Sequence, residues 1–519
     1  MHSKLFAAAG WLEEHPAWLG ALTILLGVGL VTSRVLERPL WHDELFTYYV
    51  TQADSFHRMI LQTQTVDLNP PLYYIAVRFV YHFLNPSNLA VRLPAAIAFL
   101  LSGYLLFLFV GRRLGPLYGV LASLVLLSST YQIYASEARP YAFVLFFLSL
   151  ALVGWQRAVE ESGLRRAGAL GLLFLGGVGM LLSHVLALIA YAGFFLAELI
   201  RLWVRRRPDW AVWVALLLPL FSVVVYRPLL RSHSAAVYPT MLQASFHALV
   251  VDYRVIENGI APLLAIAAIA IVLVGAHIPE RSIHGQRSFF SKPEAVLAAY
   301  LALVPFFTTV LFMRSHSAYF SRYGIVCVVG LAIFVPWFFA YWTRMNRLAA
   351  LTCCVVFAYG LYPPSFFLEL GRRLAGHSAT SDFAMSGLMS QSLSQVRPDL
   401  PFVDASGLTF LEMDHRADDS FARRIYYLTD RQAAMQYAHA TLFEGLSFLK
   451  HEFPIRANVV PYEQFIQQHR TFLVYGTVDY PEDWLLRKLM ADGATVQYLG
   501  KFRDSYKDED LYQVALGQP

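Results

Sequence analysis

Charged residues are scarce in this sequence. Only 15% of its 519 residues are Asp, Glu, Lys or Arg, whereas 57% are hydrophobic. Soluble globular proteins carry about 25% charged residues, so this composition excludes a large soluble enzyme. It indicates a polytopic membrane protein whose apolar surface is solvated by lipid. The net charge of +5 comes largely from Lys and Arg in short loops, where such residues orient a chain in the membrane.

Cysteines and short catalytic signatures are equally sparse. Cys327, Cys353 and Cys354 lie in apolar stretches, with neither metal-ligand spacing nor a disulfide framework. P-loop, dinucleotide-binding and nucleophile-elbow motifs do not occur in a fitting context, and we find no internal repeat. Basic residues form no stripe of the kind that binds nucleic acid, so we expect no nucleic-acid partner.

Long apolar runs recur throughout the first 368 residues. A helix needs about 20 apolar residues to cross the hydrocarbon core of a bilayer, and the sequence predicts about eleven such spans. They are 17–36, 92–111, 115–134, 140–156, 167–182, 185–203, 210–228, 259–277, 294–313, 323–342 and 347–367. Because 167–182 and 185–203 almost touch, they form either a tight hairpin or one broken pair.

Positive charge is unevenly divided between alternate loops. Lys and Arg gather at 112–113, 157–166, 201–207, 281–292 and 344–347. Loops rich in these residues stay in the cytoplasm, so we expect a cytoplasmic N-terminus. An odd number of spans then places the C-terminal part of the chain on the extracytoplasmic side.

Residues 369–519 differ from the rest in having frequent charges and short apolar runs. Strand-like runs at 401–404, 424–428, 471–475, 495–499 and 510–516 alternate with helix-like patterns at 408–415, 462–469 and 484–491. This alternation predicts a small α/β domain. We therefore expect a polytopic α-helical transmembrane domain, 1–368, followed by an extracytoplasmic α/β domain, 369–519. The first outer loop, 37–91, should hold an amphipathic helix at 55–64 and a short apolar helix at 72–83.

Asp43 and Glu44 are neighbours just after the first predicted span. Charged side chains at a membrane edge are costly and are usually functional. Consecutive residues point in different directions on a helix or a strand, so the pair is not a matched dyad. A carboxylate facing a cavity could serve as general base toward an acceptor hydroxyl. The alternative is a solvated acidic pair at the interface, salt-bridged to Arg38.

Further polar groups fall on the same predicted face. Asp67, Asn69 and Tyr73 flank Pro70-Pro71, a rigid corner that either positions a polar side chain or starts a helix. Glu137, Arg139 and Tyr141 open a later span. Arg139 suits phosphate recognition, unless it only forms an ion pair with Glu137.

Two more groups complete this face. His184 lies at the corner between two spans, where a histidine is either a ligand-binding group or a satisfied polar residue. Arg322 and Tyr323 open another span. Together with Arg139, Arg322 could form a basic pocket for a lipid phosphate or pyrophosphate. The alternative is interfacial anchoring by aromatic and basic residues.

The order of these motifs resembles that of a known family. The acidic pair is followed by Pro70-Pro71-Leu72-Tyr73-Tyr74, by Arg92-Leu93-Pro94, by Glu137-Ala138-Arg139-Pro140-Tyr141 and by Arg322-Tyr323. Across residues 37–323 this order resembles the bacterial GT-C glycosyltransferases of the dolichyl-phosphate-mannose protein mannosyltransferase type, which are related to the aminoarabinose transferases acting on lipid A.

The resemblance implies a multi-pass enzyme of the bacterial inner membrane that acts in cell envelope biogenesis. Its donor would be a polyprenyl-phosphate-linked sugar. A hexosyl or pentosyl group would pass, with inversion, to a glycan, lipid or protein acceptor at the extracytoplasmic face. Some relatives use a divalent metal and the mannosyltransferase type need not, so both the metal and its ligands stay open.

The resemblance also assigns roles to residues. Asp43 would be the catalytic base, with Glu44 beside it. Arg139 and Arg322 would hold the donor phosphate, accompanied by other substrate-binding candidates: Asp67, Asn69, Tyr73, Arg92, Glu137, Tyr141, His184 and Tyr323. Asn69 stands where the family often has histidine, which leaves a substrate contact at that position open.

Two functions of other classes compete with this interpretation. A transporter or flippase of a lipid-linked sugar would favour paired repeats and charged or broken helices near the midplane. The notable charges gather at one face instead. A membrane-anchored binding protein that acts through its C-terminal domain would give Asp43, Arg139 and Arg322 no function.

Overall fold

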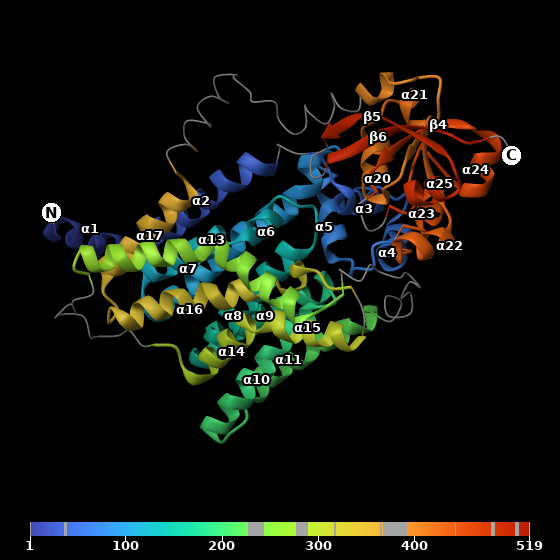
Figure 1. Cartoon of the computed structure of the whole chain (residues 1–519). Helices are drawn as coiled ribbons and strands as arrows, with labels where there is room; N and C mark the ends of the chain where they lie inside the picture. Colours follow the sequence, from blue (N-terminus) through green and yellow to red (C-terminus); the bar gives the residue numbers. More distant parts are fainter. Residues whose placement is uncertain are drawn as a thin grey trace. The chain divides into compact units, whose positions relative to one another are not determined.

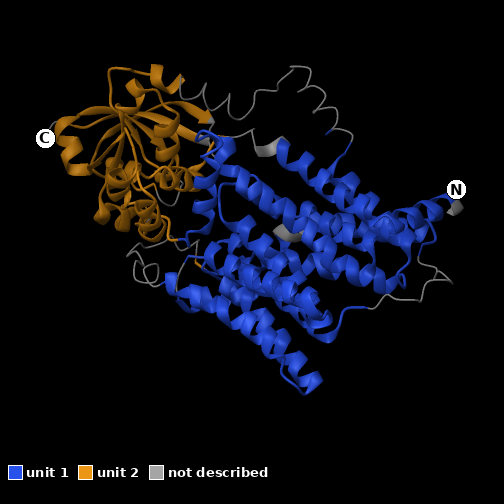
Figure 2. Ribbon diagram, turned by 180° about the vertical axis from the view of Figure 1, so that it is seen from behind, with its two compact units in different colours: residues 1–36, 69–231, 244–377 blue, residues 37–68, 232–243, 378–519 orange. Residues whose placement is uncertain are grey.

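The computed structural model describes residues 2–35, 39–226, 243–276, 289–315, 318–363, 366, 392–441, 443–478, 483–503 and 508–517. The chain forms two compact units (Figures 1 and 2). Unit 1 comprises residues 1–36, 69–231 and 244–377, and unit 2 comprises residues 37–68, 232–243 and 378–519. The first part of the predicted outer loop therefore groups with the C-terminal residues. The domain boundary at 368/369 stays a prediction.

Helices are the regular elements of unit 1 within its described residues. Its elements are α1 (His2–Glu14), α2 (Pro16–Val35), α5 (Leu72–Val80), α6 (Asn88–Leu114), α7 (Pro116–Ser128), η1 (Thr130–Ala135), α8 (Tyr141–Glu160), α9 (Gly163–Ser183), α10 (Ala187–Arg205), α11 (Trp210–Leu217), η2 (Leu218–Val225), α13 (Phe246–Leu273), α14 (Lys292–Ala302), α15 (Val304–Ser315), η4 (Ser321–Gly324), α16 (Cys327–Trp342) and α17 (Arg347–Leu361). Each predicted span overlaps at least one of them.

Among the described residues, fewer helices qualify as membrane spans than the sequence predicts. Among the described residues, four helices are long and apolar enough to cross a membrane, namely α6, α8, α9 and α10. The number rises to at most seven if each bent pair of helices forms one span. Eleven spans are not confirmed, because α7, α11 with η2, α16 and α17 are shorter apolar helices. α9 and α10 qualify separately, so 167–182 and 185–203 belong to two helices.

Helices α8 and α9 approach each other to backbone contact. A Cβ atom on Gly154 of α8 would lie 2.5 Å from the backbone nitrogen of Leu173, and one on Gly176 of α9 would lie 2.6 Å from that of Ala151. Only glycine tolerates such a distance, and small residues are the usual means of close helix packing in membranes. This packing fixes the start of α8 relative to the end of α9.

Unit 2 contains an α/β domain, as predicted (Figure 1). Its sheet has the strand order β3-β2-β1-β4-β6-β5, in which β3, β2, β1 and β4 are parallel and β6 and β5 are antiparallel to their neighbours. The core includes Val403, Leu428, Phe472 and Leu486. The elements are α3 (His42–Thr51), α4 (Phe56–Thr65), β1 (Phe402–Asp404), α20 (Gly407–Arg416), α21 (Asp419–Ala422), β2 (Ile425–Thr429), α22 (Arg431–Ala433), η5 (Ala434–Ala438), α23 (Leu446–Glu452), β3 (Asn458–Pro461), α24 (Tyr462–Gln468), β4 (Thr471–Gly476), α25 (Leu485–Ala491), β5 (Thr495–Arg503) and β6 (Asp508–Ala515).

Strand β3 and helix α3 are absent from the sequence-based prediction. β3 has only four residues and ends at Pro461, and proline in a sheet is confined to such edge or terminal positions. α3, with the sequence His-Asp-Glu-Leu-Phe-Thr-Tyr-Tyr-Val-Thr, has no apolar stripe that repeats every three to four residues. The predicted linker at 376–395 falls mostly outside the described residues.

Candidate active site

The ends of three elements bring polar side chains together in unit 1. Tyr141 is the first residue of α8, and His184 directly follows the last residue of α9. Arg322 and Tyr323 lie in η4, immediately before α16. These residues come from three predicted groups that are far apart in sequence.

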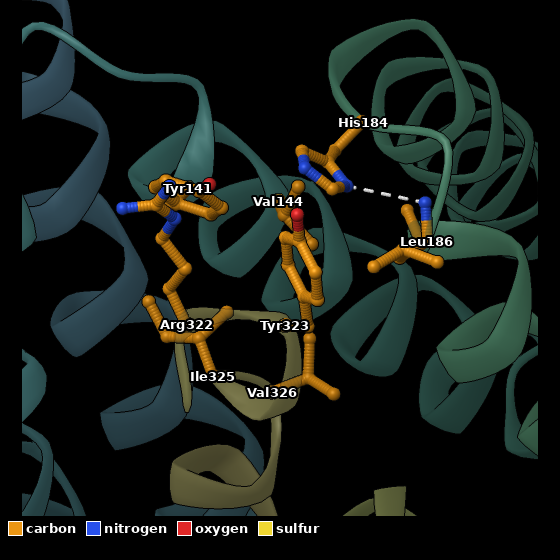
Figure 3. A pocket seen from close by; sticks show the side chains of 9 residues that line it. Tyr141, Val144, His184, Leu186, Arg322, Tyr323, Ile325 and Val326 are labelled. Carbon is orange, nitrogen blue, oxygen red and sulfur yellow. Dashed lines mark hydrogen bonds between the residues drawn. The ribbon is translucent and has the colours of Figure 1, made fainter. Parts of the chain in front are cut away.

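A small pocket lies between these ends, and Figure 3 shows its lining. The side chains of Tyr323 and His184 point toward each other, with their ring centroids 6.2 Å apart. The rings of Tyr141 and His184 are 5.3 Å apart. The lining residues are Tyr141, Val144, His184, Leu186, Ala187, Arg322, Tyr323, Ile325 and Val326.

The imidazole of His184 is held in one state. Its Nδ1 accepts a hydrogen bond from the backbone N–H of Leu186 at 3.1 Å. Burial, together with the positive charges of Arg139 and Arg322, lowers the pKa of His184 to about 3. The ring is therefore uncharged at neutral pH, and its single proton is on Nε2. His184 can donate a hydrogen bond without adding a third positive charge.

The two arginines are also constrained by their surroundings. The backbone N–H of the buried Arg139 donates to the carbonyl of Glu137 at 2.8 Å. The guanidinium carbon of Arg322 lies 4.4 Å from the centroid of the Phe320 ring. Stacking on an aromatic ring limits the motion of a guanidinium. The positive charges of both arginines lower the pKa of His184, which lines the pocket.

A buried hydrogen-bonded pair, Tyr319 and Asp252, packs next to η4. The sequence analysis did not identify it. The hydroxyl of Tyr319 donates to Asp252 Oδ2 at 2.6 Å, and both side chains are buried. The ring of Tyr319 lies 6.1 Å from that of Tyr323. Asp252 is a carboxylate in the apolar helix α13, which is a signal for function in a membrane protein. The predicted span at 259–277 begins after Asp252 and therefore omitted it.

Other predicted substrate-binding residues of unit 1 do not line this pocket. The hydroxyl of Tyr73 donates to the carbonyl of Val91 at 2.9 Å and so ties α5 to α6. Arg92 in α6 is fully buried, and Asn69 and Glu137 are also buried.

Unit 2 holds the acidic pair in the first turn of α3. Acidic side chains are favoured in that turn by the helix dipole. Glu44 is fully buried, and its Oε2 accepts from the backbone N–H of Trp41 at 3.4 Å. Asp43 is half-buried and is the more accessible of the two carboxylates.

The predicted rigid corner follows α4. The backbone N–H of Asp67 donates to the carbonyl of Gln62 at 3.3 Å, and the Asp67 side chain is half-buried. Leu68 has a φ of 53°, in the left-handed region that a leucine rarely adopts. Strained positions of this kind cluster at functional sites.

A metal-binding cluster is not found in the part of the chain that the structure describes. There, no three His, Cys, Asp or Glu side chains are grouped so that they could hold an ion. Dependence on a divalent metal stays open.

The low pKa of His184 predicts a flat pH profile. We expect the dissociation constant of a phosphodiester anion, which has no second ionisation, to change by less than about twofold between about pH 5 and 8. A histidine of ordinary pKa would become cationic in this range, and the anion would bind more tightly on acidification, with a midpoint near 6.5; such a profile would contradict the low pKa of His184.

A His184→Gln variant is the matched control, because its side chain can donate a hydrogen bond but cannot titrate. Stability must be monitored in parallel. Below a pH of about 6.5 the unfolded chain binds a proton at this histidine and the folded chain does not, so acidification favours unfolding.

The sequence matches a known family model, and the fold matches solved structures. Residues 68–226 match the family model described as dolichyl-phosphate-mannose-protein mannosyltransferase. This segment contains Arg139, Tyr141 and His184. A comparison with curated protein sequences finds no match.

Two solved structures are similar to this chain over 98% of its length and 98% of theirs, at 13% sequence identity. One is ArnT from Cupriavidus metallidurans bound to undecaprenyl phosphate, with a TM-score of 0.53, and the other is the same protein in the apo state, with a TM-score of 0.54. The chain therefore has the fold of ArnT and, within residues 68–226, the sequence pattern of the dolichyl-phosphate-mannose-protein mannosyltransferases, which confirms its resemblance to the GT-C glycosyltransferases.

Proposed function

We propose that this protein is an integral membrane glycosyltransferase that transfers a sugar from a polyprenyl-phosphate donor to a lipid, polysaccharide or protein acceptor. The family match and the ArnT fold support the class of enzyme. The single observation that carries the proposal is the pocket of Tyr141, His184, Arg322 and Tyr323, where the charges of two arginines act on an uncharged histidine. A pocket of this kind favours an anion with several oxygen acceptors.

The donor phosphate is the anion that this chemistry fits. As the bond between the anomeric carbon and the phosphate oxygen breaks, negative charge grows on the departing polyprenyl phosphate. Arg139 and Arg322 stabilise that charge, and they do so most strongly where water is excluded. The Nε2–H of His184 and the hydroxyls of Tyr141 and Tyr323 supply neutral hydrogen-bond donors.

Asp43 is the proposed general base. It accepts the proton of the acceptor hydroxyl while the oxygen attacks the anomeric carbon from the side opposite the phosphate. A single displacement of this kind inverts the configuration at that carbon. The half-buried position of Asp43 favours it over Glu44, whose buried carboxylate is engaged at the start of α3. Glu44 thus supports the catalytic turn of α3.

The other predicted residues are weaker candidates for substrate contact. Asp67 and Asn69 flank the strained Leu68, which supports a binding role for this corner. The contacts of Tyr73, and the complete burial of Arg92, favour a role in holding α5 against α6. Glu137 accepts from the Arg139 backbone and so helps to orient the loop before α8.

We place the enzyme in the bacterial inner membrane, with its N-terminus in the cytoplasm and its C-terminal domain on the extracytoplasmic side. The apolar helices support placement in a membrane, and the positive residues in alternate loops support the cytoplasmic N-terminus. The donor's polyprenyl chain is too apolar to leave the lipid, so the sugar is handled at the membrane surface and membrane lipids are constant partners.

The test is release of polyprenyl phosphate by the purified full-length protein in vesicles. The donors are undecaprenyl phosphates carrying single hexoses or pentoses, and the acceptors are an envelope lipid, a polysaccharide and a protein fraction. We expect at least one donor and acceptor pair to yield free undecaprenyl phosphate together with a new glycoside. Movement of the intact donor across the bilayer without cleavage would support a flippase and refute the proposal.

A further inference from the structure

Helix α3 carries Asp43, and its N-cap residue makes no side-chain hydrogen bond to the helix. Its N-cap residue is Trp41, whose indole has a donor but no acceptor for the first backbone N–H groups. The N–H of His42 instead donates to Oε1 of Glu412 at 2.9 Å. Glu412 lies in α20 of the C-terminal domain and is separated from His42 by 370 residues. Both residues belong to unit 2.

The carboxylate of Glu412 is itself held in place. It is fully buried, and its second oxygen, Oε2, accepts from Nη2 of Arg416 at 2.5 Å, one helical turn further along α20. A buried carboxylate with one oxygen on a cation and the other on a helix N-terminus has little freedom to move. Its charge also complements the positive end of the α3 dipole.

The rest of α3 faces the same domain. The hydroxyl of Tyr49 hydrogen-bonds Nδ1 of His415 at 3.2 Å. The ring centroids of Phe46 and Tyr49 lie 5.5 Å and 5.1 Å from that of Phe453. Contacts therefore run along α3 from its first residue to its third turn.

Helix α4, which follows α3, also makes a hydrogen bond to the C-terminal domain. Nε2 of Gln62 in α4 donates to Oε2 of Glu452, at the end of α23, at 3.0 Å. α3 and α4 each have ten residues, and helices shorter than about 12 to 15 residues are marginal in water. The two helices therefore depend on the C-terminal domain for their order.

We propose that Glu412 is a positioning residue, and that the C-terminal domain serves the reaction by holding α3, and with it Asp43, in its working orientation. This inference rests on the proposed role of Asp43 as base. A general base must lie within hydrogen-bond reach of the proton that it takes. A displacement of about 1 Å can lower the rate about a hundredfold. A short helix anchored by a buried carboxylate is a means of avoiding that loss.

The experiment compares the full-length protein with its Glu412→Ala and Glu412→Gln variants. Hydrogen exchange of the α3 amides reports the order of the helix, and steady-state kinetics with an active undecaprenyl-phosphate sugar report catalysis. In Glu412→Ala we expect α3 exchange to accelerate about tenfold or more, since a charge-assisted hydrogen bond is lost. The kcat should fall about 10- to 100-fold with an unchanged donor KM. Glu412→Gln keeps an acceptor oxygen of the same reach and should give intermediate values.

Asp404→Asn is the matched control. Asp404 is equally buried in the same domain, and its Oδ1 accepts from the Ser406 N–H at 3.0 Å and from the Thr409 hydroxyl at 2.8 Å. A general weakening of the domain would slow the enzyme in this variant too. The positioning role requires α3 exchange and kcat to stay near the wild-type values.

The outcomes separate this inference from the proposed function. Unchanged α3 exchange in Glu412→Ala overturns the inference, whatever the activity. Faster exchange with full kcat also overturns it, because α3 is then held for another purpose. Full activity in Asp43→Asn would instead refute the proposed base, while the exchange result would still decide whether Glu412 orders α3.

Discussion

Replacing Asp43 with asparagine should abolish sugar transfer. Asparagine has the same shape and can still form hydrogen bonds, but its amide does not accept a proton at neutral pH. Loss of a general base typically lowers the rate about 10²- to 10⁴-fold. We expect a fall of this size in kcat, with undecaprenyl phosphate binding unchanged, measured by glycoside formation and by binding to the purified protein.

Asp54→Asn provides the control for this change. Asp54 lies just beyond α3, is exposed and pairs with Arg58 at 3.1 Å. Exposed ion pairs contribute about 0 to 1 kcal/mol, so this variant should be as stable and as active as wild type. Full activity in Asp43→Asn would remove Asp43 as the base.

Glu44→Gln then separates the roles of the two carboxylates. Glu44 is buried at the N-terminus of α3, where a negative charge stabilises the helix by roughly 0.3 to 2 kcal/mol. We expect this variant to lose stability and to retain more transfer activity than Asp43→Asn. The reverse order would assign the base to Glu44.

Arg322→Ala should have the second large effect, on donor binding and on turnover. A hydrogen bond to a charged group contributes about 1.5 to 3 kcal/mol, which corresponds to a roughly 10- to 100-fold loss of affinity for undecaprenyl phosphate. Loss of a group that stabilises developing charge lowers kcat about 10²- to 10³-fold. Equilibrium binding of undecaprenyl phosphate and steady-state kinetics measure the two effects separately.

Two variants sharpen this prediction. Arg314→Ala removes an exposed arginine at the end of α15, only eight residues earlier in the chain, and should leave donor affinity unchanged. Arg322→Lys keeps the charge but lacks the planar fork that binds two phosphate oxygens, so it should restore activity only in part. Equal donor affinity in Arg322→Ala and wild type would exclude Arg322 from the phosphate site.

The Arg322→Ala variant should also alter the titration of His184. The charge of Arg322 is one of the causes that hold the pKa of His184 near 3, after burial and the charge of Arg139. Its removal should raise that pKa toward the ordinary value. The flat pH profile expected for phosphodiester binding to the wild type should then begin to slope at the acidic end, which tests whether Arg322 and His184 face the same pocket.

Much of the local structure follows from the sequence. Apolar runs of membrane length predicted where the helices of unit 1 lie, and alternating strand and helix patterns predicted most of the α/β domain. These predictions of the fold succeeded because hydrophobic period and proline placement are properties of neighbouring residues, so a short window of sequence contains them. The motif order also pointed to Arg139, Tyr141, His184 and Arg322, whose roles stay predictions.

Interactions between distant residues explain what the sequence could not reveal. The bends and short helices that reduce the number of qualifying spans depend on packing between helices, and the Tyr319–Asp252 pair joins α13 to the segment before η4. The acidic pair is the clearest case. The sequence by itself determined that two carboxylates stand at the start of one segment. Only the tertiary structure decided that Glu44 is buried, that Asp43 is half-buried, and that Glu412, 370 residues from His42, accepts a hydrogen bond from the first residue of their helix. A ten-residue helix takes its stability from what it packs against, and that partner is chosen by the fold.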